Sequence, residues 1–98
     1  MKLPILAAAT AAVLALPASA HASLHTCNVQ ATNTATISSS RGMTCARAAK
    51  EMKNYRGNIS KTFTTPGGFA CGRVSGGQFG GQWRCVKGQK AFRFEFAD

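Results

Sequence analysis

The C-terminal third of the sequence alternates between apolar and polar positions, as the residues of a half-buried strand do. Phe92, Phe94 and Phe96 fall on one side of such a strand, and the residues between them fall on the other. The glycine and glutamine at 88–89 predict a two-residue hairpin turn of the glycine-first type. This turn pairs Trp83 with Phe94 on the apolar side of both strands.

A glycine-rich stretch before these strands predicts a second hairpin. Its symmetry brings Cys71 beside Cys85, and both then share the apolar side with Trp83. Residues 68–97 are therefore expected to form antiparallel strands that agree on which side is buried. The stretch is not a phosphate-binding P-loop, because it lacks the lysine and the following Ser or Thr, and no helix starts after it.

Residues 43–57 show the apolar spacing of an amphipathic helix. Thr44 is expected to cap its N-terminus through the side-chain hydroxyl, and Gly57 is expected to end it. One face collects small and apolar side chains, namely Cys45, Ala48, Ala49, Met52 and Tyr55. The other face carries Arg47, Lys50, Glu51, Lys53 and Asn54. A helix with such a small apolar face can lie close to a sheet.

Residues 23–42 are polar and rich in Thr, Ser, Asn and Ala. Their pattern predicts a short strand near 34–38 and permits a second near 28–31. The predicted fold is therefore α+β, with one helix packed on an antiparallel sheet of three to four strands and stapled by two disulfides.

The first 22 residues have the pattern of a secretory signal peptide. Lys2 supplies a positive start, an apolar run follows, and small residues permit cleavage after Ala22 or Ala20. The apolar run is too short for a membrane span. Residues 23–98 then form a single small domain, which we expect to be secreted or periplasmic.

Four cysteines in a small exported chain predict two disulfides, because a core of this size needs such staples. These residues are Cys27, Cys45, Cys71 and Cys85. Bridges between sequence-distant residues close longer loops, which favours Cys45–Cys71 together with Cys27–Cys85. The cross-strand bridge Cys71–Cys85 stays open as the alternative.

Basic residues dominate the charge of the chain, which is +9 overall. Loss of Lys2 with the signal peptide leaves eleven Lys and Arg residues against three acidic ones, a net charge of +8. Such a charge favours an acidic protein, an anionic polysaccharide, nucleic acid or lipid headgroups as partner, although a solvated cationic surface without a partner explains it as well. The candidate anion-binding residues are Arg47, Lys50, Arg73, Arg84, Lys87 and Arg93.

Arg84 and Arg93 are the most specific of these candidates. The turn at 88–89 places them directly opposite each other on the outer side of two strands, where like charges cost about 0.2–1 kcal/mol. Glu95 lies diagonally from the pair, and Gly72 leaves space beside it. An anion bound by the two arginines would remove this repulsion.

The sequence offers little catalytic chemistry. After cleavage at Ala22, His25 is the remaining histidine and the carboxylates show no catalytic spacing, so we expect no enzyme activity and no cofactor. His21, His25 and Cys27 are near enough in sequence to ligate copper or zinc. Oxidation of Cys27 to a disulfide would remove its thiolate, which makes the two histidines weak metal candidates.

Phe79 stands between glycines at the tip of the second predicted hairpin. An aromatic side chain at such a tip can enter a groove or stack on a base or a sugar. Three functions therefore remain open: a non-enzymatic binding domain with a cationic surface for an acidic partner, an inhibitor-like module that inserts the Phe79 loop into an enzyme or receptor cleft, and a cationic antimicrobial or toxin-like effector.

The segments TCARAAKEMKNYR, GFACGR, WRCVKG and AFRFEF follow one another over about residues 43–96. In this order and spacing they resemble a family of small exported, cysteine-containing bacterial domains of uncharacterised function. The resemblance implies secretion, disulfides and a helix on a sheet, and it transfers no catalytic residues. Residues 23–42 lie outside the match.

Overall fold

The computed structural model describes residues 23–98. The predicted signal peptide with its cleavage positions Ala20 and Ala22, and the metal candidate His21, lie outside the described residues. Within residues 23–98, no helix is both long enough and apolar enough to cross a membrane.

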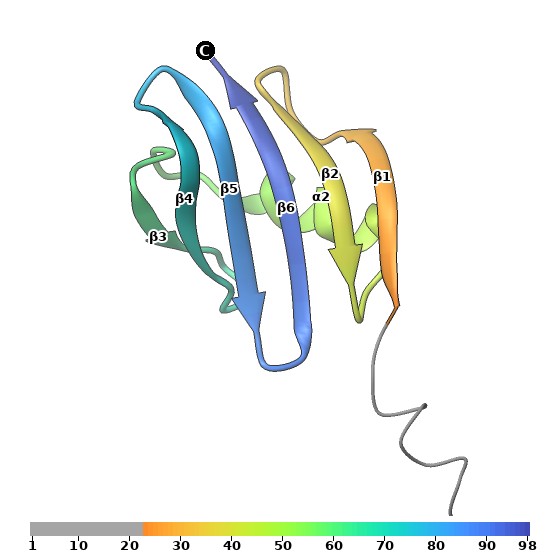
Figure 1. Cartoon of the computed structure of the whole chain (residues 1–98). Helices are drawn as coiled ribbons and strands as arrows, with labels where there is room; N and C mark the ends of the chain where they lie inside the picture. The colour runs from red at the N-terminus through yellow and green to blue at the C-terminus, as the bar shows by residue number, and fades with distance from the viewer. Residues whose placement is uncertain (1–22) are drawn as a thin grey trace, which may run out of the picture.

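Six antiparallel strands form one sheet in the order β1-β2-β6-β5-β4-β3 (Figure 1). The strands are β1 (Leu24–Gln30), β2 (Ala35–Arg41), β3 (Thr62–Thr64), β4 (Ala70–Gly77), β5 (Gly80–Lys87) and β6 (Lys90–Ala97). The last of these strands, β6, lies between β2 and β5 and joins the two halves of the sheet.

The prediction of a three- to four-stranded sheet is wrong, because β1, β2 and the short β3 all belong to the same sheet. The apolar signal in this part of the sheet is weak because the buried side of β2 holds small residues such as Ala35 and Ser40. The Ser40 hydroxyl donates a hydrogen bond to the Met43 carbonyl oxygen at 2.9 Å, which satisfies this polar group in the core. A polar, serine-rich segment therefore forms full-length strands.

The register predicted for β5 and β6 is confirmed. Trp83 pairs with Phe94, and Arg84 pairs with Arg93, on either side of the turn at 88–89. The apolar partners face the core and the arginines face away from it.

The cross-strand neighbours Cys71 and Cys85 in β4 and β5 are also confirmed. The hairpin is not symmetric, however, because Val74 is an extra residue in β4 that opposes no single residue of β5. Gly76 follows this bulge with a φ of 92°, a conformation that glycine adopts without steric cost. The bulge places Phe79 in a two-residue turn.

Helix α2 spans Cys45–Asn54 and begins as predicted. The Thr44 hydroxyl accepts a hydrogen bond from the Arg47 N–H at 3.1 Å. The helix ends at Asn54 and not at Gly57, because Tyr55 adopts an extended backbone conformation.

Tyr55 leaves the helix to join the aromatic core. Its ring stacks on that of Phe63 with 4.5 Å between the ring centres, and its hydroxyl donates to the Asn58 carbonyl oxygen at 2.6 Å. Burial raises the pKa of Tyr55 above its ordinary value, because the phenolate loses solvation. These contacts end the helix.

Glu51 was expected on the polar face of the helix, but its side chain is buried. Its carboxylate accepts a hydrogen bond from the Gly67 N–H, and the Gly67 carbonyl oxygen accepts one from the Lys87 amine at 2.7 Å. The carboxylate thereby holds the segment after β3 against the helix.

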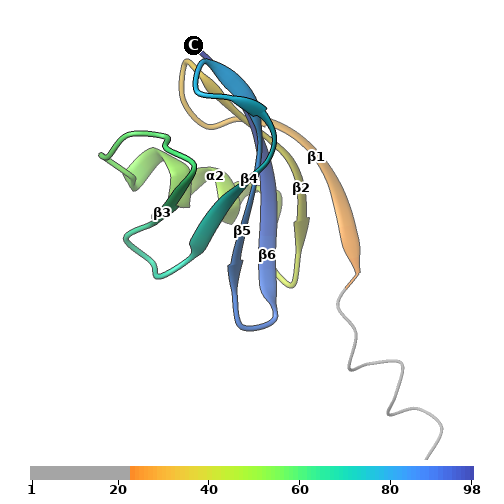
Figure 2. The ribbon, with the colours of Figure 1, turned by 60° about the vertical axis from the view of Figure 1, so that its left-hand side comes forward.

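The core lies between one side of the sheet and a second layer. This layer consists of α2 and the loops next to β3, which lie on the same side of the sheet (Figure 2). Trp83 and Phe94 are fully buried there, with 5.6 Å between their stacked rings. The helix contacts β1 and β2. The loop that follows it covers β5, where the Trp83 indole N–H donates to the Ser60 carbonyl oxygen at 2.8 Å.

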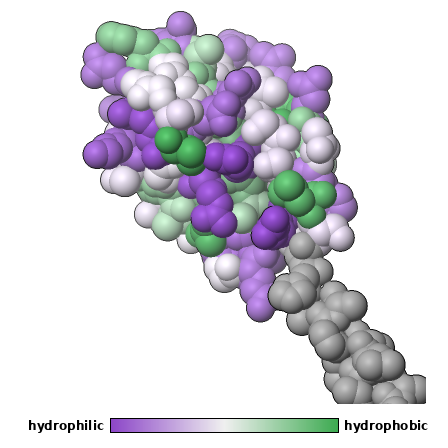
Figure 3. Space-filling view, in the orientation of Figure 1, coloured by the Kyte–Doolittle hydropathy of each residue, from purple (hydrophilic) through white to green (hydrophobic). Residues whose placement is uncertain are grey.

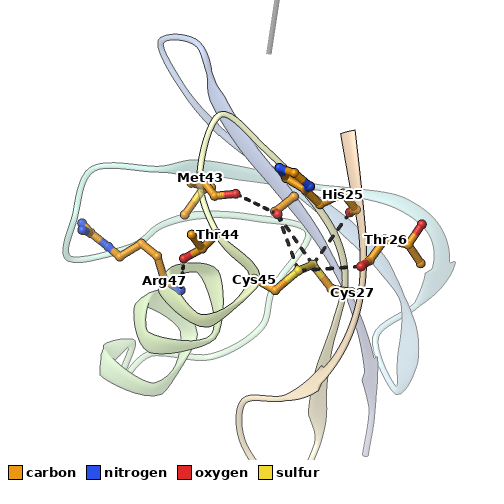
Figure 4. Close-up of a disulfide and its surroundings, with 8 residues drawn as sticks. His25, Thr26, Cys27, Met43, Thr44, Cys45 and Arg47 are labelled. Carbon is orange, nitrogen blue, oxygen red and sulfur yellow. Dashed lines mark hydrogen bonds between the residues drawn. A yellow bond between two sulfur atoms is a disulfide. The ribbon is translucent and has the colours of Figure 1, made fainter. Parts of the chain in front are cut away.

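Two disulfides close this side of the molecule, and their pairing differs from the predicted Cys45–Cys71 with Cys27–Cys85. Cys27 is bonded to Cys45, and Cys71 is bonded to Cys85. The prediction is wrong because the helix lies over β1 and β2 and not over β4 and β5. The first residue of the helix therefore meets Cys27 on β1, with 5.7 Å between the two Cα atoms (Figure 4).

Candidate anion-binding face

The sheet face turned away from α2 has no helix or loop of residues 23–98 over it (Figures 1 and 2). The strand registers arrange its side chains in three transverse rows, which together we call the open face. The middle row contains Thr26, Ser39, Arg93, Arg84, Gly72 and Thr62. The row nearer the 88–89 turn contains Leu24, Arg41, Ala91, Val86, Ala70 and Thr64. The third row contains Gln30, Thr36, Glu95, Gln82 and Ser75.

The open face is mostly hydrophilic, with a few hydrophobic side chains scattered over it (Figure 3). This follows from the period of two along a strand, since the residues between the core positions are mainly Thr, Ser, Gln and Arg. An antiparallel sheet can keep one such face in water.

Arg41, Arg84 and Arg93 lie together on this face, and we call them the arginine cluster. Arg84 and Arg93 are direct cross-strand partners, and Arg41 pairs with Ala91, two residues before Arg93 on the same side of β6. A hollow of about 200 Å³ opens between them. Its lining consists of Leu24, Ser39, Ser40, Arg41, Arg84, Ala91, Phe92 and Arg93.

Arg93 is the most constrained member of the cluster. It is half-buried, and its Nε atom is buried without a hydrogen-bond partner among residues 23–98. A buried donor without an acceptor costs about 1–3 kcal/mol, and more when it is charged. The Nε atom of Arg93 is therefore a buried donor without an acceptor among residues 23–98, in a side chain that lines the hollow.

The charge around the hollow is unbalanced. Three guanidinium groups share the open face with one carboxylate, that of Glu95 in the next row. Beside Arg84, Gly72 leaves free space, since a Cβ placed there has no neighbouring atom within 4 Å. The sheet surface beside Arg84 is therefore open on the side of Gly72.

The other predicted anion-binding residues lie elsewhere. Arg73 is on the core side, with its guanidinium carbon 5.4 Å from the centre of the Trp83 ring. Lys87 is engaged with a backbone carbonyl oxygen, and Arg47 and Lys50 are exposed on α2. Of the six candidates, the structure brings only the paired arginines of β5 and β6 together.

Arg41 and Ser39 belong to the site but not to the predicted set. The strand expected near 34–38 stops before both residues. The structure also shows an irregularity between Ile37 and Ser39, so strict alternation along β2 does not reveal which residues face outward. Only the pairing of β2 with β6 shows it, and that pairing is not visible in either segment alone.

Phe79, the predicted loop-tip contact, is 69% exposed in the turn between β4 and β5. Four residues of β5 separate it from Arg84, so it is not part of the hollow. Leu24 is also a large hydrophobic side chain that is exposed, to 60%, and it does line the hollow.

The metal candidate His25 is exposed on β1, and Cys27 beside it is bonded to Cys45. In the part of the chain that the structure describes, no group of three or more His, Cys, Asp or Glu side chains is placed to hold a metal ion. The predicted ligands are therefore not assembled within residues 23–98.

No family model, no curated protein and no solved structure matches the chain. The resemblance to small exported bacterial domains thus stays a prediction. What the protein does has to follow from the geometry and charge of the open face.

Proposed function

We propose that the chain is an exported, non-enzymatic binding domain whose open face binds an acidic partner. The signal-like pattern of residues 1–22 and the two disulfides support export, because disulfides persist in oxidising compartments. The anionic group of the partner occupies the hollow bordered by Arg41, Arg84 and Arg93.

The observation that carries the proposal is the environment of Arg93. This side chain is half-buried, lies opposite another arginine and has a buried Nε atom without a partner among residues 23–98. A carboxylate, sulfate or phosphate group would accept hydrogen bonds from the planar guanidinium in its preferred fork geometry. The same group would offset the repulsion between Arg84 and Arg93.

Retention on an immobilised polyanion under a salt gradient tests this proposal. We expect the variant Arg84→Ala with Arg93→Ala to elute at clearly lower salt than the wild type. The matched control, Arg47→Ala with Lys50→Ala, removes the same charge from α2 and should elute close to the wild type. Equal shifts in both variants would mean that net charge alone explains retention, and the proposal would fail.

A second candidate function is the inhibitor-like module, which the 69% exposure of Phe79 favours. An aromatic side chain at a hairpin tip is suited to anchoring in a cleft of an enzyme or receptor. Pull-down with three forms of the protein separates the two functions. A partner lost with Phe79→Ala and kept with the double alanine variant of Arg84 and Arg93 would favour the module, and the reverse would favour the anion binder.

A further inference from the structure

We infer that the acidic partner is an anionic polysaccharide, which lies across the open face with one carboxylate or sulfate group in the arginine cluster. This inference rests on the proposed function and narrows the class of partner. Four properties of the open face carry it: its lack of aromatic side chains, its neutral hydrogen-bonding groups, the size of the hollow and the compactness of its charge.

The three rows of the open face hold no aromatic side chain. Trp83, Phe92 and Phe94 alternate onto the buried face, and Phe79 lies in a turn. Proteins that bind single-stranded nucleic acid stack its bases on aromatic rings in addition to neutralising its phosphates. The open face offers charge without stacking, which disfavours single-stranded nucleic acid and means that a sugar chain would be held by hydrogen bonds and charge alone.

Neutral hydrogen-bonding side chains flank the arginines instead. They are Thr26, Ser39 and Thr62 in the middle row, and Gln30, Thr36, Gln82 and Ser75 in the next row. Hydroxyl and amide groups both donate and accept hydrogen bonds. The hydroxyl groups of a sugar have the same dual character, so these rows suit a chain of sugars better than a chain of phosphates.

The hollow has room for one charged substituent but not for a whole ligand. Its volume is about 200 Å³. Pockets that enclose a complete small molecule measure roughly 300–1,000 Å³, whereas a water molecule takes up about 30 Å³ in the liquid. The rest of the partner therefore lies outside the hollow on the open rows, as a polymer would.

The charge of the open face is compact and not extended. A DNA duplex carries a phosphate about every 3.4 Å along each strand and exposes its bases in grooves that admit a helix or a β-ribbon. The open face has three arginines in one cluster, and its strands belong to a six-stranded sheet and not to a free two-stranded ribbon. Protein interfaces are commonly anchored by aromatic or apolar side chains, and the rows of the open face provide Leu24 and Val86, on strands at different places in the sheet.

Titration of the purified, disulfide-bonded protein with five polymers tests the inference at about 0.15 M salt. The probes are polygalacturonate for carboxylate, dextran sulfate for sulfate, a DNA oligomer as single strand and as duplex, polyglutamate, and neutral dextran. The variants are Arg84→Gln with Arg93→Gln, Ser39→Ala, and the helix control Arg47→Gln with Lys50→Gln. Near-ultraviolet circular dichroism of Trp83 verifies that each variant keeps its core.

We expect one of the two acidic glycans to bind about tenfold tighter than DNA or polyglutamate, and neutral dextran not to bind. The double arginine variant should lose about 10- to 100-fold in affinity for that glycan, because it removes hydrogen bonds to a charged group. Ser39→Ala should lose about 2- to 10-fold in affinity for the glycan, and the helix control should bind it about as tightly as the wild type. The glycan that binds more tightly then shows whether the arginine cluster prefers a carboxylate or a sulfate group.

Two results would count against the inference in different ways. If DNA or polyglutamate bound as tightly as the tighter-binding glycan through the same arginines, the assignment to a polysaccharide would be overturned and the proposed function would stand. If the double arginine variant bound every polyanion like the wild type, the proposed function would fail, and the inference with it.

Discussion

Trp83 and Arg84 are neighbours in β5, yet their side chains lie on opposite faces of the sheet. Trp83 is fully buried against Phe94 and beneath the loop after α2. Arg84 faces solvent beside Arg93, on a surface where the nearest carboxylate belongs to the next row. One step along the strand thus separates a residue that stabilises the fold from one that we assign to binding.

The two faces of the sheet separate residues that stabilise the fold from residues that we assign to binding. The core face concentrates the large apolar side chains and both disulfides. The open face places like charges together, which lowers stability slightly and creates a site for an anion. Substitutions on the first face should therefore change stability, and those on the second should change binding.

Trp83→Ala should produce the largest loss of stability. Removal of this buried indole is expected to lower the free energy of unfolding by about 3–5 kcal/mol, through lost burial and the cavity that remains. The neighbouring Arg84→Ala should change it by no more than about 1 kcal/mol. Urea denaturation followed by far-ultraviolet circular dichroism measures both, and equal losses would contradict the division between the faces.

Removal of the bridge between Cys27 and Cys45 by alanine substitution of both should cost about 2–4 kcal/mol. The loops closed by the two bridges are similar, with sequence separations of 18 and 14, so removal of Cys71–Cys85 should cost nearly the same. Denaturation midpoints of the two double variants make the comparison. If removal of one bridge left the midpoint unchanged, the stability of the fold would not depend on that bridge.

Arg84→Gln should stabilise the protein while it weakens anion binding. Relief of the like-charge pair is expected to raise the free energy of unfolding by about 0.2–1 kcal/mol. The control Arg47→Gln removes an equal charge from an exposed position on α2 and should not show this gain. Thermal unfolding at low salt measures the effect, and a loss of stability in Arg84→Gln would mean that the pair is already neutralised within the protein.

Alkaline pH should lower the stability of the fold through Tyr55 before it changes the charge of the arginines. The pKa of Tyr55 is raised by burial, so the folded state retains its phenolic proton to higher pH than the unfolded state. The stability gained from this is present below about pH 10 and is lost as the pH rises through the raised pKa. The difference in unfolding free energy between the wild type and Tyr55→Phe should therefore shrink above that pH, and a constant difference would contradict the shift.

The hairpin of β5 and β6 was predictable because independent local signals coincide there. The alternation of Phe92, Phe94 and Phe96 sets the buried side, and the turn at 88–89 sets the register. The Arg84–Arg93 part of the site follows from that register. Local signals of this kind determine structure where partner strands are joined by a short turn.

The rest of the sheet was not predictable in the same way. β2 pairs with β6 across most of the sequence, and its core positions are small residues that give little hydrophobic contrast. Arg41 joins the cluster through this long-range pairing alone. The same is true of Cys45, because its bonding to Cys27 depends on which half of the sheet the helix covers.

The central place of β6 has a consequence for the order of folding. Strands β1 and β2 and the group β5, β4 and β3 touch each other in the sheet only through β6, which is synthesised after the other five strands of the sheet. All four cysteines precede it, so both bridges join residues that exist before the sheet can become continuous. Closure then depends on a pairing between distant parts of the chain, which is a slow kind of contact to form. Before β6 is added, the edges of β2 and β5 that will pair with it are exposed. The nascent chain has to keep these two edges from pairing with other molecules.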